Sequence, residues 1–287
     1  MQPLRPQPVD SLENLRNRVD RLLRSNEIRP REHQQTPLDL DTRVDPAAAI
    51  SHPSKSIVEF LNFLSDGVPH GDVYLFGGVL RDVALFGRRG FASDIDLVVE
   101  GDWEHCVNYL DSLGAHRNKF GGFRLAVAGW PVDIWNATET WAIRQGHVRY
   151  SGIASLTDTT VLNWDAILMN WRTGAFVCRE GYLDDLRAGT LDIVLLANPN
   201  PLGMVVRVLR HLCSKDARRV TRSAARFLAE STAKYKFAEI VGEERRSYGN
   251  SMIRRDAYTF FEQMNGSDVD SFSRTFTEFH RRDLQLV

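Results

Sequence analysis

The sequence is poor in the residues that build disulfide frameworks and zinc sites. It contains three cysteines, and their spacing matches no metal-binding motif: Cys106, Cys178 and Cys213. Its eight histidines form no paired motif either. The sequence therefore implies neither disulfide bonds nor a zinc ion.

Long apolar runs are also missing. No stretch of the 287 residues approaches the length needed to cross a bilayer, and the start, Met1–Arg5, lacks the apolar core of a secretory signal. We therefore expect no membrane partner and a cytoplasmic protein. A content of 43% hydrophobic and 25% charged residues is typical of a globular chain, and the length suggests about two domains.

A large net charge is absent as well. The 36 Lys and Arg residues nearly balance the 37 Asp and Glu residues, so no overall field attracts polyanions. The distribution is uneven, however, because residues 201–226 hold seven Lys or Arg residues and a single acid, Asp216. Arg218, Arg222 and Arg226 are spaced by four, which would place them on one helix face. That row is either a phosphate-contacting stripe or a solvated basic face.

A predicted strand is followed by a pair of glycines. Residues 73–76 are β-branched, aromatic or apolar, which is typical of a strand. Gly77 and Gly78 follow, and they allow a tight backbone turn where a side chain would obstruct a phosphate group. A triphosphate could therefore lie against the backbone amides of this turn.

Two aspartates begin the next predicted strand, residues 94–99. Because side chains two positions apart share one face of a strand, Asp94 and Asp96 point the same way, while Ile95 points into the core. Two carboxylates so close are unfavourable unless a cation neutralises them. A pair of this kind can bridge two Mg²⁺ ions, which activate an attacking hydroxyl and stabilise a pyrophosphate leaving group.

A third carboxylate usually completes such a site, and Asp133 is the best candidate. Residues 123–128 and 132–135 predict two adjacent strands that would extend the same sheet. Asp133 lies in the second of them, and it joins the site only if its side chain faces the same side as Asp94 and Asp96.

The order of these residues resembles the catalytic head of the bacterial-type poly(A) polymerases and CCA-adding tRNA nucleotidyltransferases, within the DNA polymerase β-like superfamily. That family opens with Gly-Gly-x-x-Arg-Asp, continues to a Leu-x-Gly helix end and then reaches Asp-x-Asp. The likeness covers residues 73–212 and implies an α+β fold, in which a small mixed sheet flanked by helices precedes an all-helical C-terminal region. The matching residues are Gly77, Gly78, Arg81, Asp82, Leu85, Gly87, Asp94 and Asp96.

Weaker matches follow in the order of the family. Residues 158–163 are similar to the segment that supports the ribose and triphosphate, although a Phe is missing and one residue is extra. Residues 182–191 resemble the element that leads toward the neck, and residues 207–210 resemble the Arg-x-x-Arg of the neck helix. The resemblance implies a nucleotide-binding set of Gly77, Gly78, Arg81, Asp82, Asn163, Arg207 and Arg210.

The chain also departs from the family. An acidic residue three positions before the first neck arginine helps to read the base in the family, and that position is Met204 here. The arginine expected three residues after Arg210 is Cys213. The body and tail that hold tRNA in the full-length enzymes are largely missing from these 287 residues. The nucleotide, ATP or CTP, is therefore open, and we do not expect a CCA-adding enzyme.

Each motif also has a purely structural interpretation. The glycine pair could form an ordinary turn, and the two aspartates could lie on an exposed edge strand. Their combination favours a site, because two acids ahead of an apolar strand are costly in a buried sheet. Arg81 either binds phosphate or pairs with an acid such as Asp82 or Asp94. Asp133 and Asn163 have structural alternatives of the same kind.

Three regions are predicted along the chain: residues 1–50, 51–198 and 199–287. The first contains an amphipathic helix within residues 9–23 and a flexible tether through Pro46, and it could dock on the protein itself or on a partner protein. The second is the mixed α/β head, with further helices at 56–65 and 103–113 and a hairpin over 166–179. The third is a helical neck-like domain, with helices near 201–214, 218–230, 232–246, 252–264 and 269–281.

The sequence leads to one main hypothesis, a Mg²⁺-dependent nucleotidyltransferase that moves NMP from an NTP to an acceptor hydroxyl and releases pyrophosphate. Asp94, Asp96 and Asp133 would hold two Mg²⁺ ions and carry the catalysis. The resemblance implies an RNA 3′ end as acceptor, with tRNA as one candidate. Two alternatives stay open: a catalytically idle RNA-binding or scaffold module of the same fold, and a transferase of the toxin or defence type that modifies a protein or small molecule.

Overall fold

The structure is a computed structural model of the chain. It describes residues 6–24, 51–91, 94–118, 120–215 and 217–264, and the backbone of residues 277–278. The predicted tether before Pro46 lies outside the described residues. So does the predicted helix at 269–281, except for Thr277–Glu278, which form a short strand, β11.

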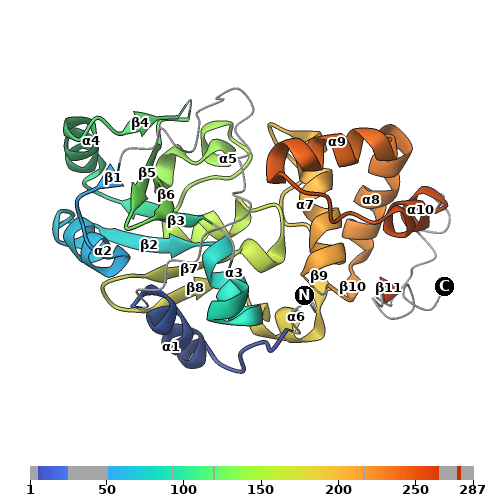
Figure 1. The fold of residues 1–287 in the computed structure, drawn as a ribbon, viewed down its shortest axis with the longest axis horizontal. Coiled ribbons are helices and arrows are strands. Elements are labelled where there is room, and N and C mark those ends of the chain that lie inside the picture. The colour runs from blue at the N-terminus through green and yellow to red at the C-terminus, as the bar shows by residue number, and fades with distance from the viewer. Residues whose placement is uncertain are drawn as a thin grey trace. The chain divides into compact units, whose positions relative to one another are not determined.

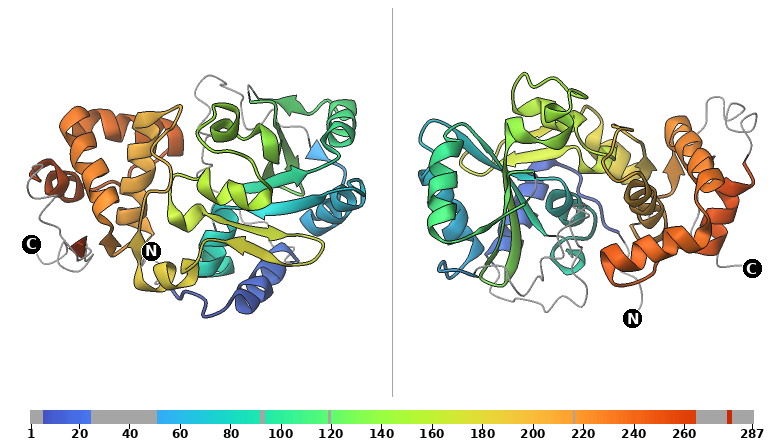
Figure 2. Two further views of the ribbon diagram at one scale, coloured as in Figure 1. Left: turned by 180° about the vertical axis from the view of Figure 1, so that it is seen from behind. Right: turned by 90° about the horizontal axis from the view of Figure 1, so that it is seen from above.

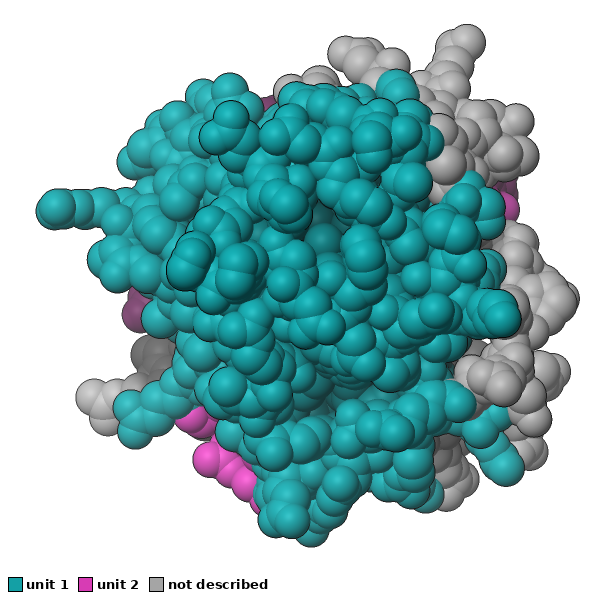
Figure 3. Space-filling view, turned by 90° about the vertical axis from the view of Figure 1, so that its left-hand side faces the viewer, with its two compact units in different colours: residues 1–32, 39–160, 165–180 teal, residues 33–38, 161–164, 181–287 magenta. Residues whose placement is uncertain are grey.

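The chain divides into two compact units, which Figure 3 colours separately. They are residues 1–32, 39–160 and 165–180 for the first unit, and residues 33–38, 161–164 and 181–287 for the second.

The first unit is built on a mixed sheet. Among the described residues it has eight strands in the order β1-β5-β6-β3-β2-β7-β8, with β4 paired to β5 (Figure 1). β3 runs parallel to β6, whereas β2 is antiparallel to both β3 and β7. The predicted α+β fold with a mixed sheet is therefore confirmed. The strands are β1 Ser51–His52, β2 Asp72–Phe76, β3 Ile95–Glu100, β4 His116–Arg117, β5 Phe123–Val127, β6 Trp130–Asn136, β7 Ile167–Asn170 and β8 Phe176–Cys178.

Helices lie along both faces of this sheet (Figure 2). On one face Tyr74, Val98 and Leu168 form an apolar cluster, which Ala137 and Leu156 from two short 3-10 helices cover. Helices α2 and α3 pack against β2. The helices of this unit are α1 Leu12–Leu23, α2 Ile57–Asp66, α3 Gly78–Phe86, α4 Trp103–Ser112 and α5 Trp141–Arg144, with the 3-10 turns η2 Arg88–Gly90, η3 Ala137–Glu139 and η4 Ile153–Asp158.

The predicted amphipathic helix near the N-terminus is confirmed as α1. Ser11 caps it, because its side chain accepts a hydrogen bond from the backbone N–H of Asn14 at 3.2 Å. The apolar stripe of α1 is buried, and the helix packs against α3. The preceding Val9 donates its N–H to the Ala84 carbonyl at 3.0 Å, which anchors the segment to α3.

The second unit is helical, with a small sheet ordered β11-β10-β9 among the described residues. The helices predicted near 201–214, 232–246 and 252–264 are confirmed as α7, α9 and α10. The elements are α6 Tyr182–Ala188, β9 Thr190–Leu191, α7 Pro201–Ser214, β10 Arg219–Val220, α8 Arg222–Lys234, α9 Phe237–Tyr248 and α10 Arg255–Glu262. The 3-10 turn η5, Asn163–Asp165, precedes them in the chain.

The predicted helix at 218–230 starts later than expected. Arg219 and Val220 pair with β9 as strand β10, and α8 begins only at Arg222, capped by the side chain of Thr221. Arg218 therefore lies outside the helix, and the prediction of three arginines on one helix face is wrong. Arg222 and Arg226 remain one turn apart on α8, and both are exposed.

Among the residues described, none of the helices combines the length and the apolar character that a membrane span requires.

Gly77 joins β2 to α3 in a conformation that other residues rarely adopt, with φ 62° and ψ −114°. An added Cβ would make only an ordinary contact, 3.5 Å from the Asp165 carbonyl oxygen, so the cost of Gly77→Ala comes from the backbone alone. We expect the free energy of unfolding to fall by about 1–3 kcal/mol. Urea denaturation measures this change.

The matched control is Gly242→Ala in α9, where an added Cβ meets nothing within 4 Å. Because alanine favours a helix over glycine, this variant should gain about 0.5–1 kcal/mol. Equal effects of the two substitutions would contradict the strained backbone at Gly77.

Candidate functional site

The structure brings Asp94, Asp96 and Asp133 to one face of the sheet. Asp96 and Asp133 are partner positions on the parallel strands β3 and β6. Asp94 lies two residues before Asp96 and forms an ion pair with Arg124, which is the cross-strand partner of Asp133 on β5. Because partner positions share a face, all four side chains lie on the same side.

The carboxylates lie at the polar end of an otherwise apolar sheet face. Phe76 is the cross-strand partner of Asp96, and its ring packs at 6.0 Å from that of Trp135, two residues beyond Asp133. Both rings pack against the apolar cluster described above. Since Phe76 is followed directly by Gly77, the glycine turn begins beside the carboxylates. Their apolar surroundings strengthen the electrostatic interactions of the site.

Arg124 lies among these acids. Its Nη2 pairs with Asp94 Oδ2, and its Nε is 3.8 Å from Asp133 Oδ1. The side chains of Arg124, Asp94 and Asp133 are only 14%, 11% and 18% exposed. We did not expect Arg124 in the site from the sequence motifs. The signal was present, because Arg124 is the one charged residue in the strand Phe123–Val127 and the hairpin places it opposite Asp133.

Asp133 is held in an environment that disfavours its charge. Burial raises the pKa of Asp133 to about 7. The Arg124 guanidinium opposes this rise, and the neighbouring Asp94 carboxylate adds to it. A cation bound at the site would shift the balance toward the charged carboxylate.

The acids suit Mg²⁺ in their chemistry, although not in their present grouping. Within the described part of the chain, no three His, Cys, Asp or Glu side chains are grouped closely enough to hold a metal ion. Carboxylate oxygens are the ligands that Mg²⁺ prefers, and three carboxylates share this face. A positive group, the Arg124 guanidinium, already stands where a cation is needed. The chemistry of the donor set therefore fits Mg²⁺.

Arg81 and Asp82 are turned into the protein. Arg81 donates from Nε to Asp82 Oδ1 at 2.8 Å, and its Nη1 forms an ion pair with Asp165. The three residues are 6%, 0% and 5% exposed, in the order Arg81, Asp82, Asp165. Of the two interpretations of Arg81, the structure shows the pairing with a nearby acid. Asp165 was not anticipated, because it lies 84 residues away in the sequence.

The glycine turn presents backbone amides at the start of α3. No side chain caps this helix at Gly77. The Gly77 N–H donates a hydrogen bond to the Ile167 carbonyl at 3.0 Å, which ties the turn to β7. The first amides of α3, beginning with that of Gly78, have no partner within the helix, as at any helix start. Together with the helix dipole, such amides favour an anion.

Asn163 belongs to the second unit and holds its backbone together. Its Nδ2 donates to Asp185 Oδ2 at 2.8 Å and to the Thr190 carbonyl at 3.2 Å. Its Oδ1 accepts the N–H of Asp192 at 2.9 Å. Both the nitrogen and the oxygen of the side-chain amide therefore form hydrogen bonds within this unit. These bonds give Asn163 a structural role there.

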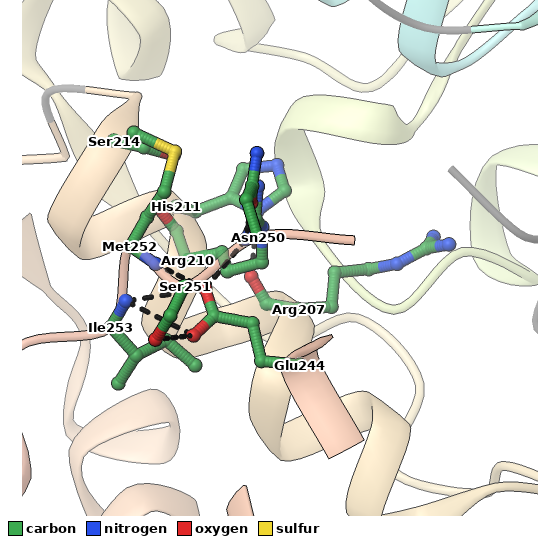
Figure 4. Close-up of polar contacts among 9 residues, drawn as sticks. All are labelled: Arg207, Arg210, His211, Ser214, Glu244, Asn250, Ser251, Met252 and Ile253. Atoms are coloured by element: carbon green, nitrogen blue, oxygen red, sulfur yellow. Dashed lines mark hydrogen bonds and ion pairs between the residues drawn. The ribbon is translucent and has the colours of Figure 1, made fainter. Parts of the chain in front are cut away.

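Arg210 is also held by other side chains (Figure 4). Its Nη1 donates to Glu244 Oε1 at 2.5 Å and to Asn250 Oδ1 at 2.9 Å, and its guanidinium lies 4.0 Å from the centre of the Tyr248 ring. Glu244 is fully buried and accepts further bonds from Ser251, Met252 and Ile253.

Arg207 extends away from these contacts (Figure 4). It is partly exposed, whereas Met204, one turn earlier on α7, is only 1% exposed. Met204 thus belongs to the core of the second unit. The carboxylate cluster of the first unit is formed without Asn163, Arg207 and Arg210.

Comparisons with known proteins find a likeness among solved structures alone. No protein-family model and no curated protein match the chain. A tRNA nucleotidyltransferase in complex with a primer tRNA and an incoming ATP analogue is similar at 18% identity and a TM-score of 0.48, over 70% of this chain and 58% of that chain. A CCA-adding enzyme with CTP is similar at 22% identity and a TM-score of 0.48, over 66% and 46% respectively.

The CCA-adding enzyme of Thermotoga maritima in complex with tRNA is similar at 20% identity and a TM-score of 0.48, over 74% of this chain and 49% of that chain. The chain thus spans about half the length of these proteins. They are enzymes of the group that the sequence motifs resemble.

The raised pKa of Asp133 makes the metal-free protein less stable at high pH. The carboxyl has a pKa of 3.8 in the unfolded chain and about 7 in the folded protein, so the folded state binds the proton more tightly. Stability is therefore lost as the pH rises from about 4 through 7. In EDTA at pH 8, the free energy of unfolding of Asp133→Asn should exceed that of the original protein by about 1–3 kcal/mol. At pH 4 the two values should differ little.

The control for Asp133 is Asp111→Asn, which removes an exposed pair with Arg117 on β4. Arg117 holds the pKa of Asp111 below its usual range, so this variant should lose a little stability at neutral pH. Denaturant titrations at the two pH values measure both effects. A destabilised Asp133→Asn protein at pH 8 would contradict the raised pKa.

The contacts of Arg210 predict a structural role for it. Arg210→Ala leaves the buried Glu244 carboxylate without its cation, so we expect the free energy of unfolding to fall by about 3–5 kcal/mol. Arg187→Ala, which breaks an exposed pair with Asp184, should cost about 1 kcal/mol or less. If Arg210→Ala left stability unchanged and weakened NTP binding instead, Arg210 would be a nucleotide contact.

Proposed function

We propose that this chain is a Mg²⁺-dependent nucleotidyltransferase, which transfers NMP from an NTP to an acceptor hydroxyl and releases pyrophosphate. The main support is the placement of Asp94, Asp96 and Asp133 on one sheet face beside the Gly77 turn. This arrangement puts oxygen ligands for divalent ions next to amides that suit a polyphosphate.

The three aspartates would hold two Mg²⁺ ions. When bound, such ions lower the pKa of an attacking hydroxyl and stabilise the charge on a pyrophosphate leaving group. Asp94 directly precedes β3 and Asp96 lies within it, so their carboxylates share a face two positions apart, and Asp133 presents its own from β6. We assign Asp133 the further task of helping to activate the acceptor hydroxyl, because a carboxylate close to it can accept its proton.

The triphosphate would lie at the glycine turn. Gly77 and Gly78 keep this turn free of side chains, and the first amides of α3 attract negative charge. Arg81 is already neutralised by Asp82 and Asp165, so we propose that it acts indirectly. By joining α3 to the segment before β7, this buried group keeps the amides in position. Asp82 contributes through Arg81 in the same way.

The acceptor is proposed to be an RNA 3′ end, with tRNA as one candidate, because the sequence motifs resemble enzymes that act on RNA. The NTP is proposed to be ATP or CTP for the same reason. Met204 is buried and apolar, so the chain lacks the family's acid for reading the base at that position. Arg207, which extends away from the Glu244 contacts, is the neck arginine we propose for a nucleotide contact.

A catalytically idle RNA-binding or scaffold module is the second candidate. The ion pair of Arg124 with Asp94 supports it, because a guanidinium among the acids neutralises them without a metal. The apolar side chains of α1 do not support the protein partner expected through residues 1–50, because they are buried and the helix packs on α3.

A transfer assay tests the proposal. The purified protein is incubated with each α-labelled NTP, Mg²⁺ and total cellular RNA or protein. We expect label on RNA, and we expect Asp94→Asn/Asp96→Asn to reduce it by about 100-fold or more, because the metal ligands are lost. Asp72→Asn, at the other end of β2, is the matched control and should keep its activity.

The position of the label decides between the candidates. Label on a protein band or on a small product would replace RNA as the acceptor. If no transfer depends on Asp94 and Asp96, the chain is an idle module, and the proposed transferase activity is wrong.

A further inference from the structure

We propose that Arg124 is a built-in cation that occupies the metal position between Asp94 and Asp133 in the metal-free protein and has to be displaced when Mg²⁺ binds. This inference rests on the proposed function. It adds a gating residue to that site, which neither the sequence motifs nor the resemblance includes.

The hairpin between β5 and β6 fixes Arg124 at this place. Its loop consists of two residues, Ala128 and Gly129, with φ values of 47° and 80°. Two-residue loops with positive φ at both positions set a strict register in antiparallel hairpins. In that register Arg124 faces Asp133, and a slip by one residue would turn it to the opposite face of the sheet.

The contacts of Arg124 are those of a counter-ion. The ion pair with Asp94 is its direct contact, while the 3.8 Å separation from Asp133 is an electrostatic contact too long for a hydrogen bond. One guanidinium thus faces two carboxylates. A third, that of Asp96, lies beside Asp133 on the neighbouring strand. Because a divalent ion carries twice the charge of a guanidinium, it competes favourably for the same oxygens.

The pair can be opened, unlike the other buried arginine of this unit. The side chains of Arg81 and its two acids are at most 7% exposed. The side chains of Arg124, Asp94 and Asp133 are 11–18% exposed, so water and ions reach them. The long arginine stem also allows the guanidinium to swing while the strand stays in place.

This role accounts for two features of the site together. Within the described residues the acids are not grouped as a metal site, although their backbone positions bring them to one face, and Arg124 pairs with one of them. The same guanidinium lets the acidic face fold before any metal arrives. We therefore expect metal binding to be weakened by the need to break the pair with Asp94.

Metal binding in two Arg124 variants tests the proposal. Mn²⁺ replaces Mg²⁺ as the probe, and electron paramagnetic resonance of free Mn²⁺ gives its dissociation constant. We expect Arg124→Gln to bind Mn²⁺ about ten-fold more tightly than the original protein, as the loss of one competing ion pair implies. Arg124→Lys keeps the charge but loses the planar fork, so its affinity should lie between the two.

Arg117→Gln is the matched control. Arg117 lies on the neighbouring strand β4 and pairs with Asp111, with both side chains nearly half exposed. This variant should bind Mn²⁺ as the original protein does. Without metal, Arg124→Gln should melt at a lower temperature than Arg117→Gln, because Asp94 and Asp133 lose their counter-ion. Added Mn²⁺ should raise its melting temperature more than that of the original protein.

The outcomes separate this inference from the proposed function. Equal or weaker Mn²⁺ binding by Arg124→Gln, beside clear binding by the original protein, overturns the gating role and leaves the transferase standing. If the folded original protein and both variants bind no Mn²⁺, the metal-dependent function fails and the inference fails with it. Should Arg124→Gln not fold, Arg124→Lys carries the same comparison.

Discussion

The repulsion among three carboxylates on one sheet face is the constraint on which the site depends. Asp96 and Asp133 are fixed side by side by strand pairing, and Asp94 follows from the alternation of β3. Such a face is stabilised by a proton on one acid, which the raised pKa of Asp133 favours, and by a positive charge among the acids. Arg124 supplies such a charge through its ion pair with Asp94.

The rest of the first unit isolates this polar spot. Apolar residues on the same face lie under the segment 137–158, and Phe76 and Trp135 form the wall between that core and the acids. Arg81 forms ion pairs with the buried acids Asp82 and Asp165, so it does not compete for the carboxylates of the site. In the second unit, Arg210 forms an ion pair with the buried Glu244 in the same way. Two motif arginines thus support structure.

Local sequence patterns predicted most elements of the fold and the three aspartates, because strand alternation and helix periodicity are local properties. What they missed depends on pairing across the chain. Arg124 acquires its role from the register of a hairpin, and Asp165 meets Arg81 only after β7 joins the sheet. The helix expected at 218–230 begins late because β9, far back in the chain, takes residues 219–220 into a sheet. The spacing of residues along the sequence does not predict any of these long-range pairings.

The short connection between β5 and β6 has an evolutionary consequence. Loops usually accept insertions, because extra residues on a surface disturb little. Here Ala128 and Gly129 set which side of β5 carries a charge. One additional residue in the connection that shifted the pairing would drive a guanidinium into the apolar side of the sheet and expose Phe123 or Leu125 among the acids. Length variation at this bend should therefore be rare among descendants of the same ancestor, even where its amino acids change.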